Sequence, residues 1–214
     1  RVLSSFYKQG YDDVRIFFED NHAVKRIQHE VKNYLMSYEI VDQTPNSLHI
    51  KSLSTLNYAD FDTMLRKSFQ VGLSMAKSSL EMIRQEKFDD LNDILVLEHA
   101  NNRFTSYCQR LLVKKGYKEQ KKTVFMYLLI WQQENVVDNY KYMLQYFMKT
   151  KKKPAKKLLD LYQEVNDFFE LYYEMFYKYD QKKARRFSLM RQELIDTGHS
   201  YFGDPKLDQQ MVYH

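Results

Sequence analysis

Four oxygen-bearing side chains are the residues of this sequence best suited to chemistry: Glu98, Asn102, Glu134 and Asp138. The members of each pair are four residues apart, so on a helix they are neighbours on one face. Carboxylate and amide oxygens are the ligands that hard and borderline cations prefer, and pairs on two packed helices are how helix bundles hold such ions. The four residues therefore form a candidate site for a divalent or ferric metal ion (iron, Mn, Mg, Ca or Zn).

Both pairs lie on helical segments, at positions where the pattern calls for apolar residues. Segments 89–115 and 120–150 have the three-to-four-residue apolar spacing of helices. The expected inward face of the first is marked by Leu91, Ile94, Leu95, Thr105, Cys108 and Leu112, and that of the second by Val124, Leu128, Trp131 and Tyr142. Carboxylates on such a face repel one another unless a cation or hydrogen-bond donors offset their charge. Two interpretations stay open: a bound metal ion, or ion pairs with Arg103, Arg110 or lysines of facing helices.

The other reactive side chains do not predict catalysis. Cys108 lies on an inward face, where a thiol is usually a small core residue, and the sequence shows no Cys–His arrangement that would activate it. His99 adjoins Glu98 but points about 100° away around the helix, as expected of a surface histidine. No Gly-rich phosphate loop occurs, and the carboxylates lack the Glu-x-x-His spacing of di-metal enzymes. We therefore predict a protein without enzymatic activity.

Composition predicts a helical protein of the cytoplasm. The 214 residues include 18 Tyr and 14 Phe, enough for a packed core, and only 5 Gly and 3 Pro, which favours long helices. One cysteine excludes an intramolecular disulfide and suits a reducing compartment. No apolar run approaches the ~20 residues of a membrane span, so we expect no membrane insertion. Because the chain opens on Arg1, we expect an upstream segment to have been removed or left out.

Residues 1–57 predict a small βαββ unit. Gly10 is expected to end a short first helix, because glycine readily takes the left-handed cap conformation. Alternating apolar residues predict strands at 14–18, Tyr38–Gln43 and Leu48–Leu53, with a turn at Thr44-Pro45-Asn46 and a helix that Asn21 caps and that carries Val24, Ile27, Val31 and Leu35 on one face.

The rest of the chain predicts an antiparallel helix bundle. Residues 58–150 hold the helix Ala59–Gln85 and the two acidic segments, and residues 151–214 hold helices at Ala155–Tyr179 and Lys182–Phe202. The inward face of the first of these helices is expected at Phe61, Leu65, Phe69, Gly72, Met75 and Ala76. Short connections between helices favour antiparallel neighbours, so the fold class is mainly α.

Several segments of this sequence resemble one family. Glu134-Asn135-Val136-Val137-Asp138 resembles the E-x-x-x-D signature of PhoU-type phosphate-uptake regulators, and Glu98-His99-Ala100-Asn101-Asn102 stands where that family usually has the partner acidic pair. Phe61-Asp62, Leu65-Arg66 and Phe69 are similar to the first helix of a PhoU repeat. Gly10-Tyr11-Asp12, the βαββ unit, Asn102-Arg103-Phe104 and Cys108-Gln109-Arg110 resemble the archaeal branch.

The resemblance implies a PhoU-like bundle, with 58–150 as a three-helix repeat and 151–214 as a partial second repeat. It also implies metal clusters on the carboxylate face in some members, dimerisation in some, and control of phosphate uptake through a phosphate transporter or a signalling component such as a sensor kinase. The sequence departs from the pattern at Asn102, where an acid is expected, and in lacking a third helix for the second repeat. The AbrB-like DNA-binding module of many archaeal members is absent from these residues, so DNA binding does not carry over.

Two surfaces predict partners. Aromatic residues surround the helix Ala155–Tyr179, and we expect Phe169, Tyr173 and Phe176 to contribute to a homodimer or partner surface. The alternative function is a nucleic-acid-binding regulator module that uses basic residues: Arg15, Lys25, Arg26, Lys32 and the run 149–157. That run is also what a solvated linker would look like.

Overall fold

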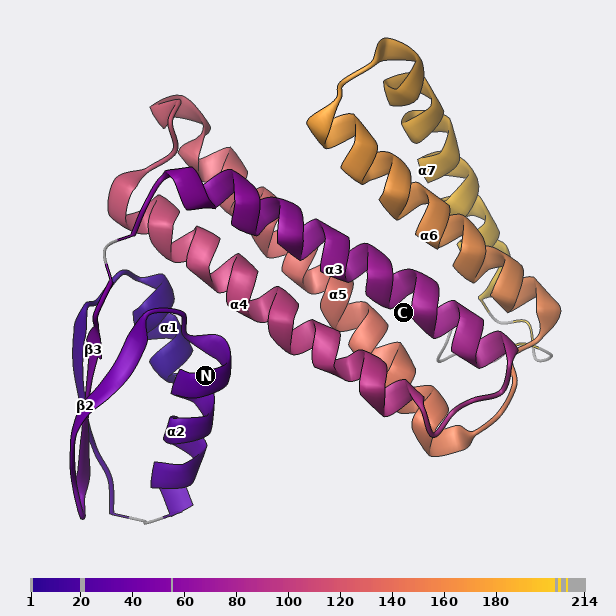
Figure 1. Ribbon diagram of the computed structural model, residues 1–214. Helices are drawn as coiled ribbons and strands as arrows, with labels where there is room; N and C mark the ends of the chain where they lie inside the picture. Colours follow the sequence, from indigo (N-terminus) through magenta and orange to yellow (C-terminus); the bar gives the residue numbers. More distant parts are fainter. Residues whose placement is uncertain (1, 20–21, 55, 203, 205–206, 208–214) are drawn as a thin grey trace. The chain divides into compact units, whose positions relative to one another are not determined.

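The computed structural model describes residues 2–19, 22–54, 56–202, 204 and 207. The chain is mainly helical, and a small antiparallel sheet precedes the long helices, as the sequence predicts (Figure 1). In chain order the elements are α1 (Val2–Lys8), β1 (Asp13–Phe17), α2 (His22–Tyr34), β2 (Tyr38–Thr44), β3 (Ser47–Ser52), α3 (Ala59–Arg84), α4 (Leu91–Lys115), η1 (Gln120–Lys122), α5 (Thr123–Thr150), α6 (Lys156–Tyr177) and α7 (Gln181–Tyr201). The expected cap Asn21 lies outside the described residues.

The chain divides into two compact units. Unit 1 comprises Arg1–Ser68 and His99–Asn135, and unit 2 comprises Phe69–Glu98 and Val136–His214. Helices α3, α4 and α5 each continue from one unit into the other, so each unit contains a segment of all three. The expected division of the sequence into three domains stays a prediction.

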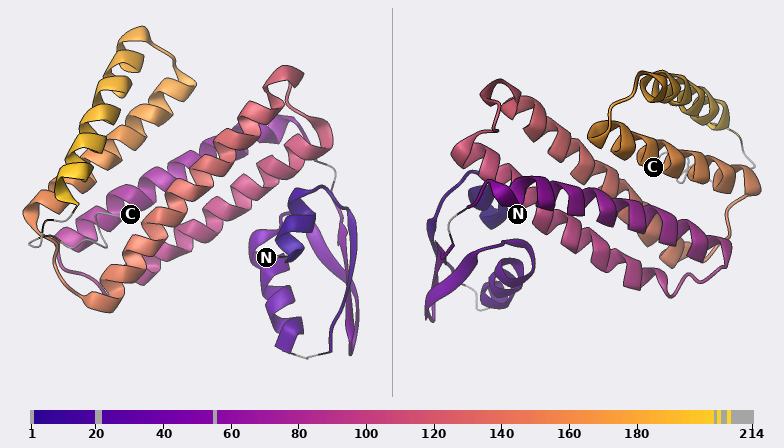
Figure 2. Two further views of the ribbon diagram at one scale, coloured as in Figure 1. Left: turned by 180° about the vertical axis from the view of Figure 1, so that it is seen from behind. Right: turned by 45° about the horizontal axis from the view of Figure 1, so that its top comes forward.

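The α/β part of unit 1 is a three-stranded sheet with helices on one face. The strand order is β1-β3-β2, and both pairings are antiparallel. Helices α1 and α2 cover the same face of the sheet (Figures 1 and 2). The core between the layers consists of Leu3, Tyr7, Val14, Val31, Leu35, Tyr38 and Ile50. Pro45 and Asn46 form the predicted turn between β2 and β3. Gly10 has φ +91° just after α1, which confirms its expected role as the residue that ends this helix.

Arg110 of α4 ties this α/β part to the helices of unit 1. Its side chain is fully buried. One guanidinium nitrogen donates to the carbonyls of Tyr7 and Tyr11, at 2.8 and 2.7 Å, and another donates to the Asp12 carboxylate. The rings of Tyr7 and Tyr38 lie 4.8 and 5.1 Å from the guanidinium carbon, within the range of cation–π attraction. A buried charge is tolerated only when it is paired and hydrogen-bonded, and here both conditions are met.

The inward faces predicted for α3 and α4 are confirmed in all but two positions. On α3 all six predicted residues are buried, and on α4 Leu91, Ile94, Thr105, Cys108 and Leu112 are buried while Leu95 is half-buried. Glu98 is also buried, and Asn102 is half-buried. The apolar spacing therefore located these faces even where polar residues interrupt it.

The inward face predicted for α5 is wrong. Val124, Leu128 and Trp131 are 71%, 52% and 46% exposed, and Tyr142 is exposed as well. The buried face is instead formed by Met126, Leu129, Ile130, Gln133, Val137, Tyr140, Met143, Leu144 and Phe147. Apolar residues stand on two sides of α5, so spacing alone predicts two possible inward faces, and only one of them is buried.

Two other helices of unit 2 approach α3 closely at Gly72. A Cβ atom there would lie 3.1 Å from both a ring carbon of Phe169 and a methyl group of Val137. The expected close approach of another helix is confirmed, because α5 and α6 both press on α3 at this glycine.

We predict opposite effects for the same substitution at two helical glycines. Gly72→Ala should lower the free energy of unfolding by about 1–3 kcal/mol, since the added methyl group overpacks the contact with Phe169 and Val137. Gly198→Ala in α7 is the control, because nothing lies within 4 Å of the new methyl group. It should raise the free energy of unfolding by about 0.5–1 kcal/mol through helix propensity. Urea denaturation measures both, and equal effects would contradict the packing assigned to Gly72.

Candidate functional site

Glu98 and Asp138 meet on the ammonium group of Lys141 in unit 2. The Glu98 side chain is buried on α4, four residues after the buried Ile94. Lys141 follows Asp138 by three residues on α5, so both project from one side of that helix. Its Nζ lies 3.0 Å from Glu98 Oε1 and also donates to Asp138 Oδ1. One cation therefore bridges two helices and offsets two carboxylates.

The environment of Lys141 keeps it charged. Burial lowers the pKa of the Lys141 ammonium, but the hydrogen bonds to Asp138 and Glu98 and the charges of both carboxylates raise it, and the pKa ends above its ordinary value. The three side chains are between 8% and 29% exposed. An ion pair at this depth is less screened than a surface pair and is costly to break from one side.

Glu134 forms a separate ion pair in unit 1. Lys8, the last residue of α1, places its Nζ 3.0 and 3.1 Å from the two oxygens of the Glu134 carboxylate. The side chains of Lys8 and Glu134 are 22% and 18% exposed. This contact joins the α/β part of unit 1 to α5. It also removes the uncompensated charge that made Glu134 look anomalous in the sequence.

Asn102 lies beside a layer of buried polar side chains in unit 1. The amide of Gln133 donates to the Ser68 carbonyl at 3.0 Å and to Asn101 Oδ1 at 2.9 Å, linking α5, α3 and α4. Gln109, about two turns further along α4, is fully buried, and its amide has no hydrogen-bond partner among the described residues. Buried amides are normally paired, so this layer is a costly feature of the core that the sequence pattern did not single out.

The predicted metal ligands are thus engaged by lysines. Glu98 and Asp138 share Lys141, and Glu134 holds Lys8. Among the described residues, no three His, Cys, Asp or Glu side chains converge where they could hold a metal ion. In this conformation the Lys141 ammonium group contacts both Glu98 and Asp138, two of the expected ligands. Metal binding at Glu98, Asn102, Glu134 and Asp138 stays a prediction, one that requires Lys141 to move away.

The two lysines differ in whether the sequence could have identified them as ion-pair partners. The partners considered there were Arg103, Arg110 and unspecified lysines, whereas Arg110 is engaged with Asp12. Lys141 could have been found from its i, i+3 spacing to Asp138. Lys8 could not, since it is 126 positions away from Glu134 and only the fold brings the two together.

Cys108 and His99 have the roles expected of core and surface residues. Cys108 is fully buried on α4, and burial raises the pKa of its thiol well above the ordinary value. A protonated, inaccessible thiol is a poor nucleophile, and Cys108 acts as a small core side chain, with its sulfur 3.8 Å from the Phe61 carbonyl oxygen. His99 is half-buried, and its ring lies 5.1 Å from that of Tyr34 between centroids.

The aromatic residues of α6 surround Phe69 of α3 within unit 2. The fully buried Phe69 ring lies 6.4, 5.7 and 5.6 Å from the rings of Phe169, Tyr173 and Phe176. Phe169 is buried, whereas Tyr173 and Phe176 are half-buried. These contacts within the chain account for much of the aromatic surface of α6. The assignment of the three residues to a dimer or partner surface stays a prediction.

Comparison of the chain with protein-family models, with curated proteins and with solved structures returned no match. Among the described residues, no helix combines the length and the apolar character needed to cross a membrane.

We predict that Lys141→Gln lowers the free energy of unfolding by about 1–3 kcal/mol at neutral pH, because it removes the ammonium group that pairs with the buried Glu98 carboxylate. Lys122→Gln is the matched control. Lys122 also pairs with an acid three residues away, Glu119, but both side chains are about half exposed, so the change should stay within about 0.5 kcal/mol. Urea denaturation measures both variants.

The pH dependence follows from the raised pKa of Lys141. A lysine with a raised pKa in the folded state stabilises the fold fully below its unfolded-state pKa of about 10.4, and this stabilisation declines as pH rises through the folded-state pKa. The difference between wild type and Lys141→Gln should therefore be constant from pH 6 to 9, as an approximate range, and shrink only in more alkaline solution. A difference that vanished near neutral pH would contradict the bridging role of Lys141.

Proposed function

We propose that this chain is a non-enzymatic helical regulator of the PhoU type, which controls phosphate uptake by contacting a phosphate transporter or a signalling component. The proposal is supported by the E-x-x-x-D segment at 134–138 and by the order of the helices. Helices α3, α4 and α5 are consecutive and long, and α6 and α7 follow them, as in one three-helix repeat and part of a second.

The observation that carries the proposal is an exposed apolar stripe at the N-terminal end of α5. Val124, Phe125, Leu128 and Trp131 are all exposed, although the opposite side of the same helix is packed in the core. Water-exposed apolar side chains grouped on one helix are typical of protein–protein contact surfaces, and exposed tryptophan is enriched at the energetic centres of such surfaces. We infer that this stripe, which we call the α5 stripe, receives an apolar helix of the regulated protein.

The ionisable groups favour a structural and regulatory role. Glu98, Glu134 and Asp138 are neutralised by lysines, Arg110 is bound to Asp12 and two backbone carbonyls, and Cys108 is held as a protonated thiol in the core. Each of these groups has a partner or an environment in which it can stabilise the fold. Catalytic groups, in contrast, are usually poised with shifted pKa values in an open cleft.

The fold of unit 1 gives little support to the alternative that the chain binds nucleic acid. Arg15 faces outward on β1, whereas Lys25, Arg26 and Lys32 belong to α2, which covers the opposite face of the sheet. On the outer face, Arg15 lies opposite His49, whose other neighbour is Asp42, and Lys51 lies between Asp13 and Glu39. Acids and bases alternate across these strands, so the face lacks the concentrated positive charge that phosphate backbones require.

The basic run between α5 and α6 is partly neutralised within unit 2. Lys151 pairs with Asp89 at 2.6 Å, and Lys153 pairs with Glu86 at 2.8 Å. These contacts favour a connector that holds the helix ends together. Binding of nucleic acid by this run stays a prediction.

Deletion of the gene in its host should test the proposed function. We expect the deletion strain to take up labelled phosphate several-fold faster in phosphate-rich medium, because a repressing contact is lost. The wild-type gene should restore the low rate. Leu128→Ala/Trp131→Ala should fail to restore it at equal protein abundance, since the α5 stripe is truncated without disturbing buried residues. Val96→Ala/Tyr179→Ala, which truncates two exposed apolar residues elsewhere, should restore it.

Two outcomes would contradict the proposal in different ways. An unchanged uptake rate in the deletion strain would show that the chain does not control phosphate uptake. A changed rate that Leu128→Ala/Trp131→Ala restores in full would keep the regulatory function but remove the α5 stripe from it.

Metal binding at the acidic residues is a separate prediction. A bound divalent ion present at about 100 times its dissociation constant would add ~2.7 kcal/mol to the free energy of unfolding. We expect Lys141→Gln to show a larger rise in melting temperature with Mn²⁺ than wild type, because the competing ammonium is gone from between Glu98 and Asp138. Glu134→Gln/Asp138→Asn should respond less than either. No rise with any metal ion in wild type and in Lys141→Gln, or an equal rise in all three proteins, would contradict the site.

A further inference from the structure

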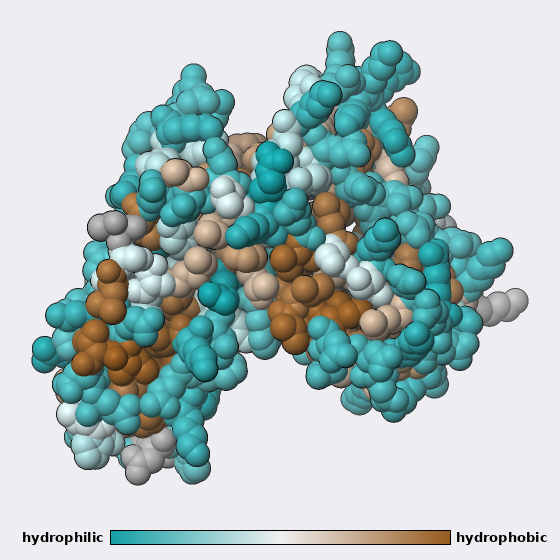
Figure 3. All heavy atoms as spheres, in the orientation of Figure 1, coloured by the Kyte–Doolittle hydropathy of each residue, from teal (hydrophilic) through white to brown (hydrophobic). Residues whose placement is uncertain are grey.

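Helix α7 is the least covered long helix of unit 2. It forms an antiparallel hairpin with α6, and the ring of Phe187 stacks on that of Phe168 with 4.3 Å between centroids (Figure 1). None of the residues of α7, all of which are described, is buried. In the space-filling view, the α6–α7 hairpin shows a few hydrophobic residues within a mostly hydrophilic surface (Figure 3). Leu189, which is 57% exposed, is one apolar residue that α6 leaves uncovered.

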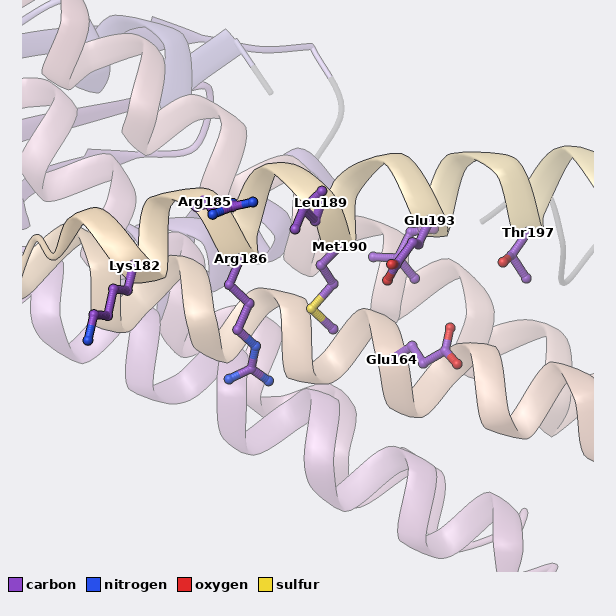
Figure 4. A pocket seen from close by; sticks show the side chains of 9 residues that line it. Glu164, Lys182, Arg185, Arg186, Leu189, Met190, Glu193 and Thr197 are labelled. Atoms are coloured by element: carbon purple, nitrogen blue, oxygen red, sulfur yellow. The ribbon is translucent and has the colours of Figure 1, made fainter.

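A groove of about 720 Å³ runs along this uncovered side of α7. It is lined by Glu164 of α6 and by residues of α7 that include Lys182, Arg185, Leu189, Glu193 and Thr197. Figure 4 shows their order: Lys182 and the two arginines stand toward one end, Glu193, Glu164 and Thr197 toward the other, and Leu189 and Met190 lie between them. The groove therefore has a cationic end, an apolar centre and an acidic end.

The charges of this surface repeat symmetrically about Leu189. Lys182 and Arg185 precede it by seven and four residues, and Glu193 and Asp196 follow it by four and seven. All five side chains are exposed and occupy one side of the helix, because their spacing is three or four residues throughout. We call these five residues the α7 stripe. Its pattern is two bases, a leucine and two acids, with mirrored spacing.

The charged groups of the α7 stripe are not satisfied within unit 2. Among the described residues, Lys182, Arg185 and Glu193 take part in no ion pair, and Asp196 only accepts a hydrogen bond from Gln192. By contrast, the neighbouring Lys183 pairs with Glu174 at 2.5 Å. Cations in the first turns of a helix are also disfavoured by the helix dipole. Each end of the stripe therefore carries exposed charges that are available to pair with opposite charges of another molecule.

We propose that the α7 stripe binds a second copy of this chain, with the two α7 helices antiparallel and crossing at Leu189. In this arrangement Arg185 lies opposite the partner's Glu193, and Lys182 lies opposite the partner's Asp196. A two-fold axis repeats both contacts, and the two leucines meet at that axis. An interface in which one patch binds its own copy must be self-complementary, and the mirrored pattern of the stripe meets that requirement.

The charge pattern selects this occupant and this direction. A parallel pair of α7 helices would place bases beside bases and acids beside acids, which is unfavourable. An unrelated partner would need the same mirrored pattern on a helix of its own, whereas a second copy supplies it without a further assumption. The proposal concerns assembly and does not rest on the role in phosphate uptake.

Sedimentation velocity of the full chain over a series of concentrations tests the proposal. Wild type should show a reversible monomer–dimer equilibrium that weakens as salt is added, because screening acts on the four exposed charge pairs. Lys182→Glu/Arg185→Glu should raise the dissociation constant about tenfold or more, since every contact becomes a repulsion. Glu193→Lys/Asp196→Lys should do the same. Lys25→Glu/Arg26→Glu, an equal change of net charge on exposed residues of α2, should leave the equilibrium unchanged.

The decisive measurement mixes the two α7 variants. In an antiparallel pair, the all-acidic stripe of Lys182→Glu/Arg185→Glu faces the all-basic stripe of Glu193→Lys/Asp196→Lys. The mixture should therefore form a heterodimer, although each variant alone stays monomeric. Circular dichroism melting of both variants checks that they remain folded, and heterodimer formation itself requires folded helices.

Three results would overturn the proposal. A wild-type chain that stays monomeric at every concentration would show that the α7 stripe does not bind a second copy. Another segment of the chain or another protein would then be its partner. A dimer that tolerates both charge reversals would place the interface elsewhere, for example at Phe169, Tyr173 and Phe176. A mixture that stays monomeric would exclude the antiparallel pairing.

Discussion

The burial of one guanidinium group is the constraint on which unit 1 depends. Arg110 reaches from α4 into the α/β part, and its hydrogen bonds to the Tyr7 and Tyr11 carbonyls fix the end of α1 and the turn that follows it. Lysine could not replace it, because a planar fork is needed to reach two carbonyls and a carboxylate while lying between two aromatic rings. Since Lys8 directly follows Tyr7, the hydrogen bond from Arg110 to the Tyr7 carbonyl also positions Lys8 to pair with Glu134. Arg110 therefore contributes both to the packing of the α/β part on α4 and to the Lys8–Glu134 ion pair on α5.

Local patterns in the sequence were enough to locate the helices and strands but not to choose every buried face. On α3 the apolar residues form one stripe, and Gly72 stands where α5 and α6 approach, so the packing followed from spacing alone. On α5 two apolar stripes compete, and Trp131 marks the exposed one. Buried residues are mostly hydrophobic, but hydrophobic residues are not always buried, because much of the surface of a folded protein is apolar. Spacing therefore cannot decide between two such stripes when both are long enough to fill a core.

The polar residues of the core mark a second limit of the sequence. Arg110, Gln109 and Gln133 are fully or almost fully buried, although side chains of these types are usually exposed. Arg110 is compensated by groups far away in the sequence, and only the fold reveals them. The sequence identified the acidic residues, and the ion-pair interpretation expected lysines of facing helices as partners. It did not identify Lys8 of α1 as the partner of Glu134. A tethered ammonium such as that of Lys141 is always present beside its carboxylates, so a metal ion must displace it in order to bind.

The two exposed stripes differ in what they specify. The α5 stripe presents Val124, Leu128 and Trp131 without a mirrored charge pattern, so its apolar area favours contact but does not define which helix it receives or in which direction. The α7 stripe presents a single leucine, so its apolar area is small, but its charges define both the partner and the orientation. A surface of the first kind suits a regulator that must hold another protein. A surface of the second kind suits assembly of identical copies.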